Sequence, residues 1–202
     1  MSTSQNNLSI PIIKIPEGRL GIWILIAGEL VIFGGAIACY LLFRIRYPHW
    51  ADMAKHTNTF IGALNTVVLL LSSYTVVRAH GASLKHDIAK VRLWLSCSVL
   101  GGLIFLINKG FEWSKDISEG FTLTSPKLVA AGDQVGSLFW SFYYFMTGLH
   151  GTHVLVGMIC MIIIMIQTRK GNNLHRVELV GMYWHMVDLI WIFLFPLLYI
   201  AK

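Results

Sequence analysis

The chain has 202 residues, of which 55% are hydrophobic and 13% are charged, and its mean hydropathy is +0.64. Soluble domains usually carry about 25% charged residues, so this composition excludes an ordinary soluble enzyme and indicates a membrane protein. The net charge of +6 comes from Lys and Arg in short segments between apolar runs, which is typical of topology signals and headgroup contacts and argues against nucleic-acid binding.

The first 17 residues are predicted to form a retained polar tail. They lack the basic start, the apolar stretch and the small-residue cleavage site of a signal peptide. The rest of the chain, residues 18–202, is predicted to form one transmembrane domain.

Five apolar segments follow the tail. A helix that crosses the hydrocarbon core needs about 20 apolar residues. Lipid offers no hydrogen bonds, and the runs are continuous instead of alternating, so helices are expected and strands are not. The sequence therefore predicts an all-α polytopic membrane protein with five transmembrane helices in one bundle, at 20–43, 60–77, 91–111, 135–166 and 180–201.

The fourth segment is too long for a helix perpendicular to the membrane. At 1.5 Å per residue it would reach about 48 Å, against a core of about 30 Å. We expect it to tilt, kink or project, with Gly148, Gly151 and Gly157 as weak points or close-packing positions.

The distribution of Lys and Arg predicts the topology. If the N-terminus lies inside, the inner segments hold nine of these residues and the outer segments hold six. The expected orientation is therefore N-inside and C-outside.

Ionisable residues within the spans are the candidate functional residues, because such groups are costly in lipid and usually face a partner helix or water. Glu29 lies about 13 Å into the first span, near the midplane. It can be a proton-exchanging group or a stabiliser beside a proton route. The alternative is a protonated or hydrogen-bonded packing residue, and on the residues alone packing is favoured.

Two further polar pairs lie in the fourth and fifth spans, each at i, i+3 spacing: His150 with His153, and His185 with Asp188. Such groups can bind a metal or haem, but hydrogen bonding between helices is favoured. No histidine pair has two facing partners at corresponding depth, as a two-haem bundle needs. A di-haem cytochrome is therefore a disfavoured alternative. An absorption spectrum of the isolated chain without a Soret band would eliminate it.

Lys109, Glu112, Lys115 and Asp116 cluster at the outer end of the third span. A solvated helix end is the favoured interpretation, and an ion pair of Glu112 with Lys109 or Lys115 is the alternative.

Other features predict structural roles. The three cysteines are expected to be small buried residues, and the tryptophans of the last two spans to be either interfacial or packing residues (Cys39, Cys97, Cys160; Trp140, Trp184, Trp191).

Five stretches, in this order, resemble subunit III of the haem–copper respiratory oxidases. They read WILIAGELVIF, LNTVVLLLSSYTV, NKGFEWSKDISEGF, GSLFWSFYYFMTGLHGTHVLVGM and MYWHMVDLIWIFLFPLLYI. Together they cover roughly residues 18–200, and the ordered set is much more specific than any one stretch. The length is similar to that of the family's short form, which has five helices.

The resemblance implies a non-catalytic subunit of a proton-pumping terminal oxidase, foremost a cytochrome c oxidase, that reduces dioxygen to water in aerobic respiratory electron transport. It implies no redox centre, metal or catalytic residue in this chain; haem and copper lie in partner subunits. The expected partners are catalytic subunit I, other oxidase subunits, bound phospholipid and a wider respiratory supercomplex. The expected location is the bacterial cytoplasmic (inner) membrane.

The resemblance also assigns residues. Glu29 matches the family's buried carboxylate, which reacts with hydrophobic carbodiimides, and we expect it to face a lipid cleft with His150 as its partner. Glu112, His185 and Asp188 match other recurring polar positions. This chain departs from the family near Glu112, because the family often has Gln where Lys109 stands and Tyr where Trp113 stands.

Three alternatives stay open. Nitric oxide reductases and quinol oxidases carry similar accessory subunits, and the residues of this chain do not choose among these enzymes, because the electron donor docks elsewhere. A proton-coupled transporter, with Glu29, His150 and His185 as a relay, belongs to another class. Against it, the five spans show no inverted repeat and no interrupted helix pair.

Overall fold

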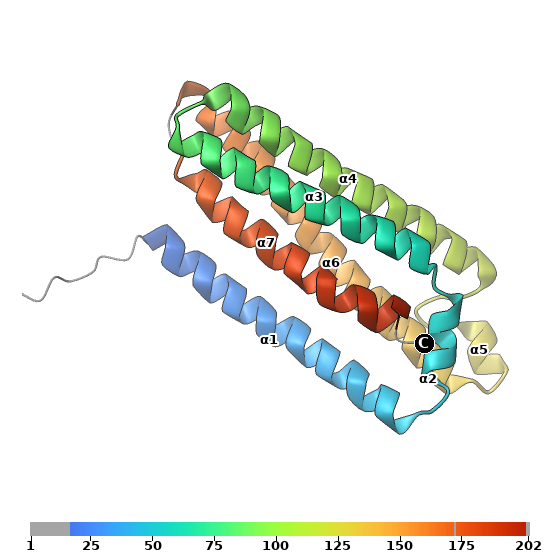
Figure 1. Cartoon of the computed structure of the whole chain (residues 1–202). Coiled ribbons are helices and arrows are strands. Elements are labelled where there is room, and N and C mark those ends of the chain that lie inside the picture. The colour runs from blue at the N-terminus through green and yellow to red at the C-terminus, as the bar shows by residue number, and fades with distance from the viewer. Residues whose placement is uncertain (1–16, 172, 201–202) are drawn as a thin grey trace, which may run out of the picture.

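Every element that the structure describes is helical. The computed structural model describes residues 17–171 and 173–200. Five long helices alternate in direction (Figure 1): α1 (Glu17–Arg46), α3 (Thr59–Leu84), α4 (Ile88–Glu119), α6 (Gln134–Gln167) and α7 (Arg176–Phe195). Short helices lie between them or follow α7: α2 (Trp50–Met53), η1 (Ala54–His56), α5 (Pro126–Ala130), η2 (Thr168–Lys170) and η3 (Pro196–Ile200).

The prediction of an all-α protein with five membrane-crossing helices is confirmed. Five described helices are long and apolar enough to span a bilayer, the last comprising α7 and η3 together. Figure 1 places the starts of α1, α4 and α7 at one end and the ends of α1 and α4 at the other. The assignment of these ends to inside and outside remains a prediction from the Lys and Arg counts.

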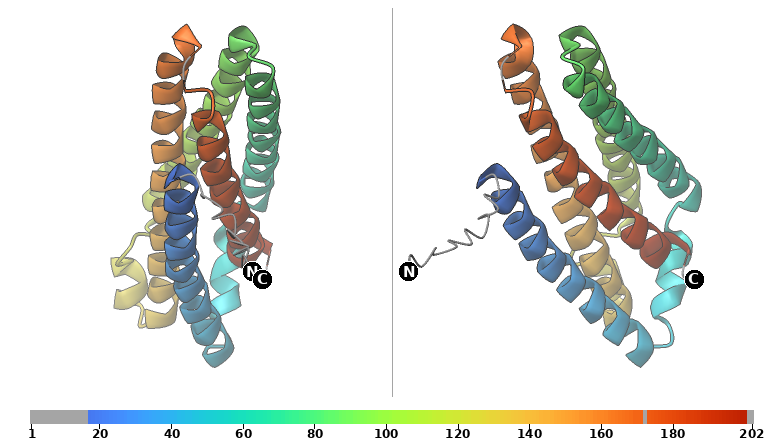
Figure 2. Two further views of the ribbon diagram at one scale, coloured as in Figure 1. Left: turned by 90° about the vertical axis from the view of Figure 1, so that its left-hand side faces the viewer. Right: turned by 60° about the vertical axis from the view of Figure 1, so that its left-hand side comes forward.

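Four helices form the bundle, and α1 lies at its edge. Helices α3, α4, α6 and α7 pack against one another, whereas α1 packs beside α7 and α6 (Figure 2). In the most apolar stretch of α1 only 6% of the residues are buried, whereas in that of α7 the share is 56%. Helix α7 is therefore the central helix, and most of α1 is available to lipid or another chain.

Besides apolar packing, three polar contacts join α1 to the rest of the described chain. An exposed ion pair joins Arg19 to Glu178 at 2.6 Å, and at the other end the Tyr40 hydroxyl donates to the carbonyl of Leu197. Such exposed pairs contribute little to stability, about 1 kcal/mol or less. The third contact, between Glu29 and His153, belongs to the candidate site.

Short polar side chains begin three of the long helices. Asn58, Asp87 and Asp133 accept hydrogen bonds from backbone amides in the first turns of α3, α4 and α6. Such caps satisfy donors that the helix leaves free. Asp87 also pairs with Lys90, and these hydrogen bonds hold the pKa of Asp87 below its ordinary value of 3.8.

Helix α6 runs without interruption for 34 residues, about 51 Å, so it must tilt or project beyond the hydrocarbon core. The glycines do not break it. Gly157 instead permits close packing, because a Cβ there would lie 2.8 Å from the indole of Trp184. Close packing at Gly157 is therefore confirmed and no glycine interrupts the helix, whereas tilt or projection remains a prediction.

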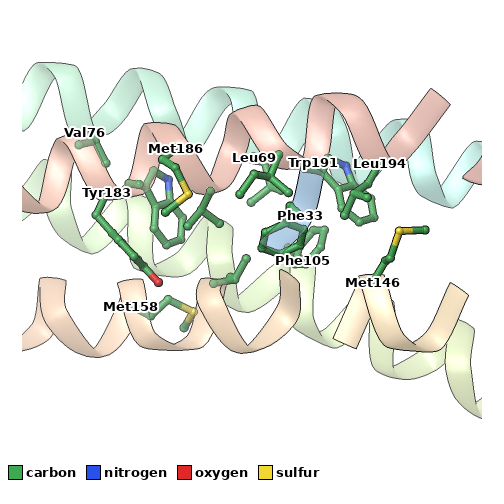
Figure 3. Close-up of a cluster of buried hydrophobic side chains, with 14 of the residues drawn as sticks. Phe33, Leu69, Val76, Phe105, Met146, Met158, Tyr183, Met186, Trp191 and Leu194 are labelled. Atoms are coloured by element: carbon green, nitrogen blue, oxygen red, sulfur yellow. The ribbon is translucent and has the colours of Figure 1, made fainter. Parts of the chain in front are cut away.

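Aromatic, aliphatic and methionine side chains fill the centre of the bundle (Figure 3). Trp140, Trp184 and Trp191 are fully buried, so all three are packing residues and not interfacial ones. The indole of Trp184 donates to Ser72 of α3 and that of Trp191 to Thr66, so both rings also bond across helices. The expectation of buried cysteines is wrong for Cys39 and Cys97, which are exposed because they lie on the outer faces of α1 and α4.

Candidate functional site

Glu29 lies on the face of α1 that turns toward α6. Its Oε2 is 2.9 Å from Nε2 of His153, and the two side chains are only 19% and 14% exposed. The atoms are at ion-pair distance, although their orientation is not that of a hydrogen bond. Phe33, one turn further along α1, packs edge-on against the same imidazole at 5.5 Å. The apolar ring thus shields one side of the pair.

The hydrogen bond of the other ring nitrogen, Nδ1, determines the tautomer of His153. Nδ1 of His153 lies 2.7 Å from the carbonyl oxygen of Leu149, and a carbonyl only accepts, so Nδ1 is the donor. In a neutral ring Nε2 is then an acceptor, and it faces a carboxylate that is also an acceptor. A proton on either group would make the contact attractive. Glu29 and His153 are therefore a candidate pair for proton exchange.

A hollow opens beside this pair, between α1, α6 and α7. Leu25, Glu29, His153 and Tyr183 are among the residues that line one part of it, about 200 Å³. A larger apolar part of about 330 Å³ adjoins it, shares Leu25 and Tyr183, and has Arg176 on its wall. The Tyr183 hydroxyl donates to the carbonyl of His153. Glu29 is therefore reachable from an apolar space that suits a lipid chain.

The expected pairing of Glu29 with His150 is wrong. His150 is fully buried and packs between Phe105 and Trp191, and neither of its ring nitrogens has a hydrogen-bond partner among the described residues. Three residues along a helix turn the direction by about 300°, so His150 and His153 point about 60° apart. That difference is enough for His153 to face α1 while His150 faces the bundle interior.

Lys109 and Glu112 form a buried ion pair, so the interpretation of this helix end as solvated is wrong. Lys109 Nζ lies 3.0 Å from Glu112 Oε2 and donates to the hydroxyls of Tyr143 and Tyr199. Tyr199 in turn donates to Glu112. Asp116, one turn on, is 5% exposed, and its Oδ2 has no hydrogen-bond partner in the described part of the chain.

Sequence reasoning missed the two tyrosines of this group, which come from α6 and η3. The available signal was the i, i+3 spacing of Lys109 and Glu112 within an apolar run, where a lone charge is costly. The Lys–Glu–Tyr cluster, Lys109, Glu112, Tyr143 and Tyr199, ties the ends of α4, α6 and η3 together. Oε1 of Glu112 has no hydrogen-bond partner among the described residues, but the contacts of its Oε2 and of Lys109 across helices indicate a structural role.

His185 and Asp188 lie on α7 but are not brought to Glu29. Nδ1 of His185 is 2.6 Å from the hydroxyl of Ser73 on α3. Asp188 is 4% exposed, and neither carboxylate oxygen has a hydrogen-bond partner among residues 17–171 and 173–200. The sequence-predicted polar positions therefore fall at separate places in the bundle. Glu29 and His153 meet beside a hollow.

Metal ligation finds no support in this geometry. In the described ranges, no group of three or more His, Cys, Asp and Glu side chains is placed to hold a metal ion. Some of the polar residues instead form pairs between helices, such as Glu29 with His153 and Ser73 with His185.

A comparison with protein families matches the model described as "Cytochrome c oxidase subunit III" over residues 18–202. Curated relatives match over nearly the same range. The subunit 3 of cytochrome c oxidase from Thermostichus vulcanus is 30% identical over 191 residues, 92% of this chain and 88% of the relative. That from Bacillus subtilis (strain 168) is 32% identical over 195 residues, 91% and 87% of the two chains.

A relative with a different name matches equally well. The "Probable quinol oxidase subunit 3" of Staphylococcus haemolyticus (strain JCSC1435) is 32% identical over 190 residues, which cover 90% of this chain and 87% of the relative. The two names refer to oxidases with different electron donors, cytochrome c and quinol. Similarity at this level therefore extends across both kinds of oxidase.

Proposed function

The chain belongs to the cytochrome c oxidase subunit III family, and we propose that it sustains proton uptake beside the catalytic subunit of a bacterial haem–copper oxidase. It is an integral membrane protein and a subunit III of such an oxidase. Under this proposal haem and copper are held by partner subunits. The location is the cytoplasmic membrane, and a respiratory supercomplex is the wider assembly.

The contact between Glu29 and His153 carries the proposal. Nδ1 of His153 donates to Leu149, so Nε2 faces the Glu29 carboxylate at 2.9 Å, close enough for a proton to pass between them. Burial of ionisable side chains in a membrane costs free energy, so those that are found there commonly serve a function. A pair of this kind next to a hollow is therefore a functional candidate. Glu29 and His153 would buffer protons near the entry route of subunit I.

A phospholipid in the hollow between α1 and α7 is part of the same proposal. The walls are largely apolar, and Arg176, whose guanidinium donates to Gln167, lies at the end where a headgroup phosphate would sit. A lipid chain there would exclude bulk water from Glu29. It would also fill the gap that α1 leaves at the edge of the bundle.

The first experiment identifies the complex. The tagged full chain is recovered in mild detergent, its partners are identified by mass spectrometry, and a reduced-minus-oxidised spectrum assigns the haem. We expect a haem–copper catalytic subunit with the haem bound to it, and the partner also distinguishes a cytochrome c oxidase from a quinol oxidase or a nitric oxide reductase. A stable chain without partner or haem would contradict the proposal, and proton flux by that chain in liposomes would then support a transporter.

The second experiment tests the role of the pair. Glu29→Gln removes the exchangeable proton and keeps the shape, so assembly and haem content should stay near normal while activity decays sooner under sustained turnover. Glu119→Gln is the matched control, because that carboxylate is 47% exposed at the end of α4. An unchanged decay rate in Glu29→Gln would assign the pair to helix packing.

A further inference from the structure

A second hollow lies on a different face of the bundle, between α4 and α6. Its volume is about 610 Å³. Four residues come from α4 and four from α6 and the η2 turn that follows it, each set at spacing i, i+3, i+4 and i+7, which is a single helical face. The two stripes that we call the α4–α6 groove are Ala89, Arg92, Leu93 and Ser96 on one side, and Ile162, Met165, Ile166 and Arg169 on the other.

The groove is apolar along its length and basic at one end. Leu93, Ile162 and Ile166 are exposed to 58%, 41% and 57%. The hydroxyl of Ser96 donates to the sulfur of Met165 at 3.4 Å, which joins the two walls. Arg92 and Arg169 lie toward the end where α4 begins and α6 finishes, because Arg92 is the fifth residue of α4 and Arg169 lies just after α6.

Backbone features bring the two arginines to one place. Thr168 caps the end of α6 by donating to the carbonyl of Ile164, and the turn of η2 that follows carries Arg169. Gly171 then adopts a φ of +78°, and a Cβ at this position would lie 3.4 Å from the side chain of Ile88 at the start of α4. This close approach places η2 against the first turn of α4.

The charge of the groove end is not balanced within the described chain. Two other basic residues at this end have acidic partners, since Lys90 pairs with Asp87 and Arg19 with Glu178. Neither Arg92 nor Arg169 forms an ion pair with any described residue. Two guanidinium groups that line one hollow repel each other unless an anion lies between them.

We propose that the α4–α6 groove is a binding site for an anionic phospholipid, with its phosphate between Arg92 and Arg169 and an acyl chain along Leu93, Ile162 and Ile166. Guanidinium groups form strong charge-assisted hydrogen bonds to phosphate. Basic hollows between transmembrane helices at the cytoplasmic side are suited to such headgroups. At 32 residues, about 48 Å, α4 is long enough for its first turns to reach the headgroup level. This site is separate from the hollow beside Glu29 and does not depend on the proton role.

The test uses the purified complex that contains the full chain, placed in vesicles of phosphatidylcholine with a minority of phosphatidylglycerol. Either lipid carries a photoactivatable acyl chain, and peptides from α4 and α6 are analysed for lipid adducts. We expect adducts at Leu93, Ile162 or Ile166 from phosphatidylglycerol and much fewer from phosphatidylcholine. Each of Arg92→Gln and Arg169→Gln should lower the phosphatidylglycerol adduct about fivefold.

The control is Lys85→Gln, which removes an exposed charge at the same end but outside the groove, and should leave the adduct yield unchanged. Arg92→Lys keeps the charge and should retain most of the yield if the phosphate is recognised. Equal yields from the two lipids, or unchanged yields in both Gln variants, would overturn the proposal. Adducts between the groove and a partner subunit in place of lipid would also overturn it, because the groove would then be a protein interface.

Discussion

Nε2 of His153 and Oε2 of Glu29 lie 2.9 Å apart and join α6 to α1, the helix that otherwise makes few buried contacts. The contact lies beside a hollow that opens between these helices and α7. Nδ1 of His153 donates to the carbonyl of Leu149, which leaves Nε2 to face the Glu29 carboxylate. The geometry thus places a carboxyl group where it is reachable from an apolar space.

We predict that a hydrophobic carbodiimide modifies Glu29 and spares Glu112. Carbodiimides react with protonated carboxyl groups, and the Glu29 side chain is 19% exposed beside an apolar hollow, whereas that of Glu112 is 2% exposed and paired with Lys109. The measurement is peptide mass spectrometry after treatment of the purified complex with dicyclohexylcarbodiimide. Glu29→Gln should abolish the adduct, and equal labelling of Glu112 would contradict the assigned exposure.

Lys109→Met should destabilise the protein by about 3–5 kcal/mol, because it leaves the Glu112 carboxylate buried without its cation. The double change Lys109→Met with Glu112→Gln removes both charges and should recover part of that loss. The unfolding free energy of the purified chain in mild detergent is the measurement. If the single and double variants were equally stable, the pair would not be the source of the effect.

Gly157→Ala should destabilise the bundle by about 1–3 kcal/mol, although alanine usually favours a helix. The new Cβ would lie 2.8 Å from the Trp184 ring, which is fully buried and cannot withdraw. Gly28→Ala in α1 is the control, since nothing lies within 4 Å of its Cβ position. It should be neutral or stabilising by up to about 1 kcal/mol. Thermal unfolding compares the two variants, and equal midpoints would count against the close contact.

Asn65 and Asn108 should be energetically coupled. The amide of Asn108 donates to Asn65 Oδ1 at 2.9 Å and links α3 to α4 inside the bundle. Hydrogen bonds between helices in membranes contribute about 0.6–2 kcal/mol. A double-mutant cycle with Asn65→Ala and Asn108→Ala should yield a coupling energy of this size. Strictly additive losses would show that the two amides act independently.

The sequence by itself determined the five helices and the membrane class. In lipid each span must satisfy its own backbone, so the length and apolarity of a segment determine its structure without information about its neighbours. The predicted span at 91–111, for example, lies within α4 (Ile88–Glu119). The ordered motifs also indicated the family, because they are local patterns.

Only the tertiary structure decided which polar side chains meet. His150 and His153 share i, i+3 spacing, but the rotation of about 60° between them sends one toward Trp191 and the other toward Glu29. Lys109 and Glu112 looked like a solvated helix end because their cover comes from Tyr199, which is 87 residues beyond Glu112 in the chain. Burial depends on how helices distant in sequence pack together, and local spacing does not contain that information.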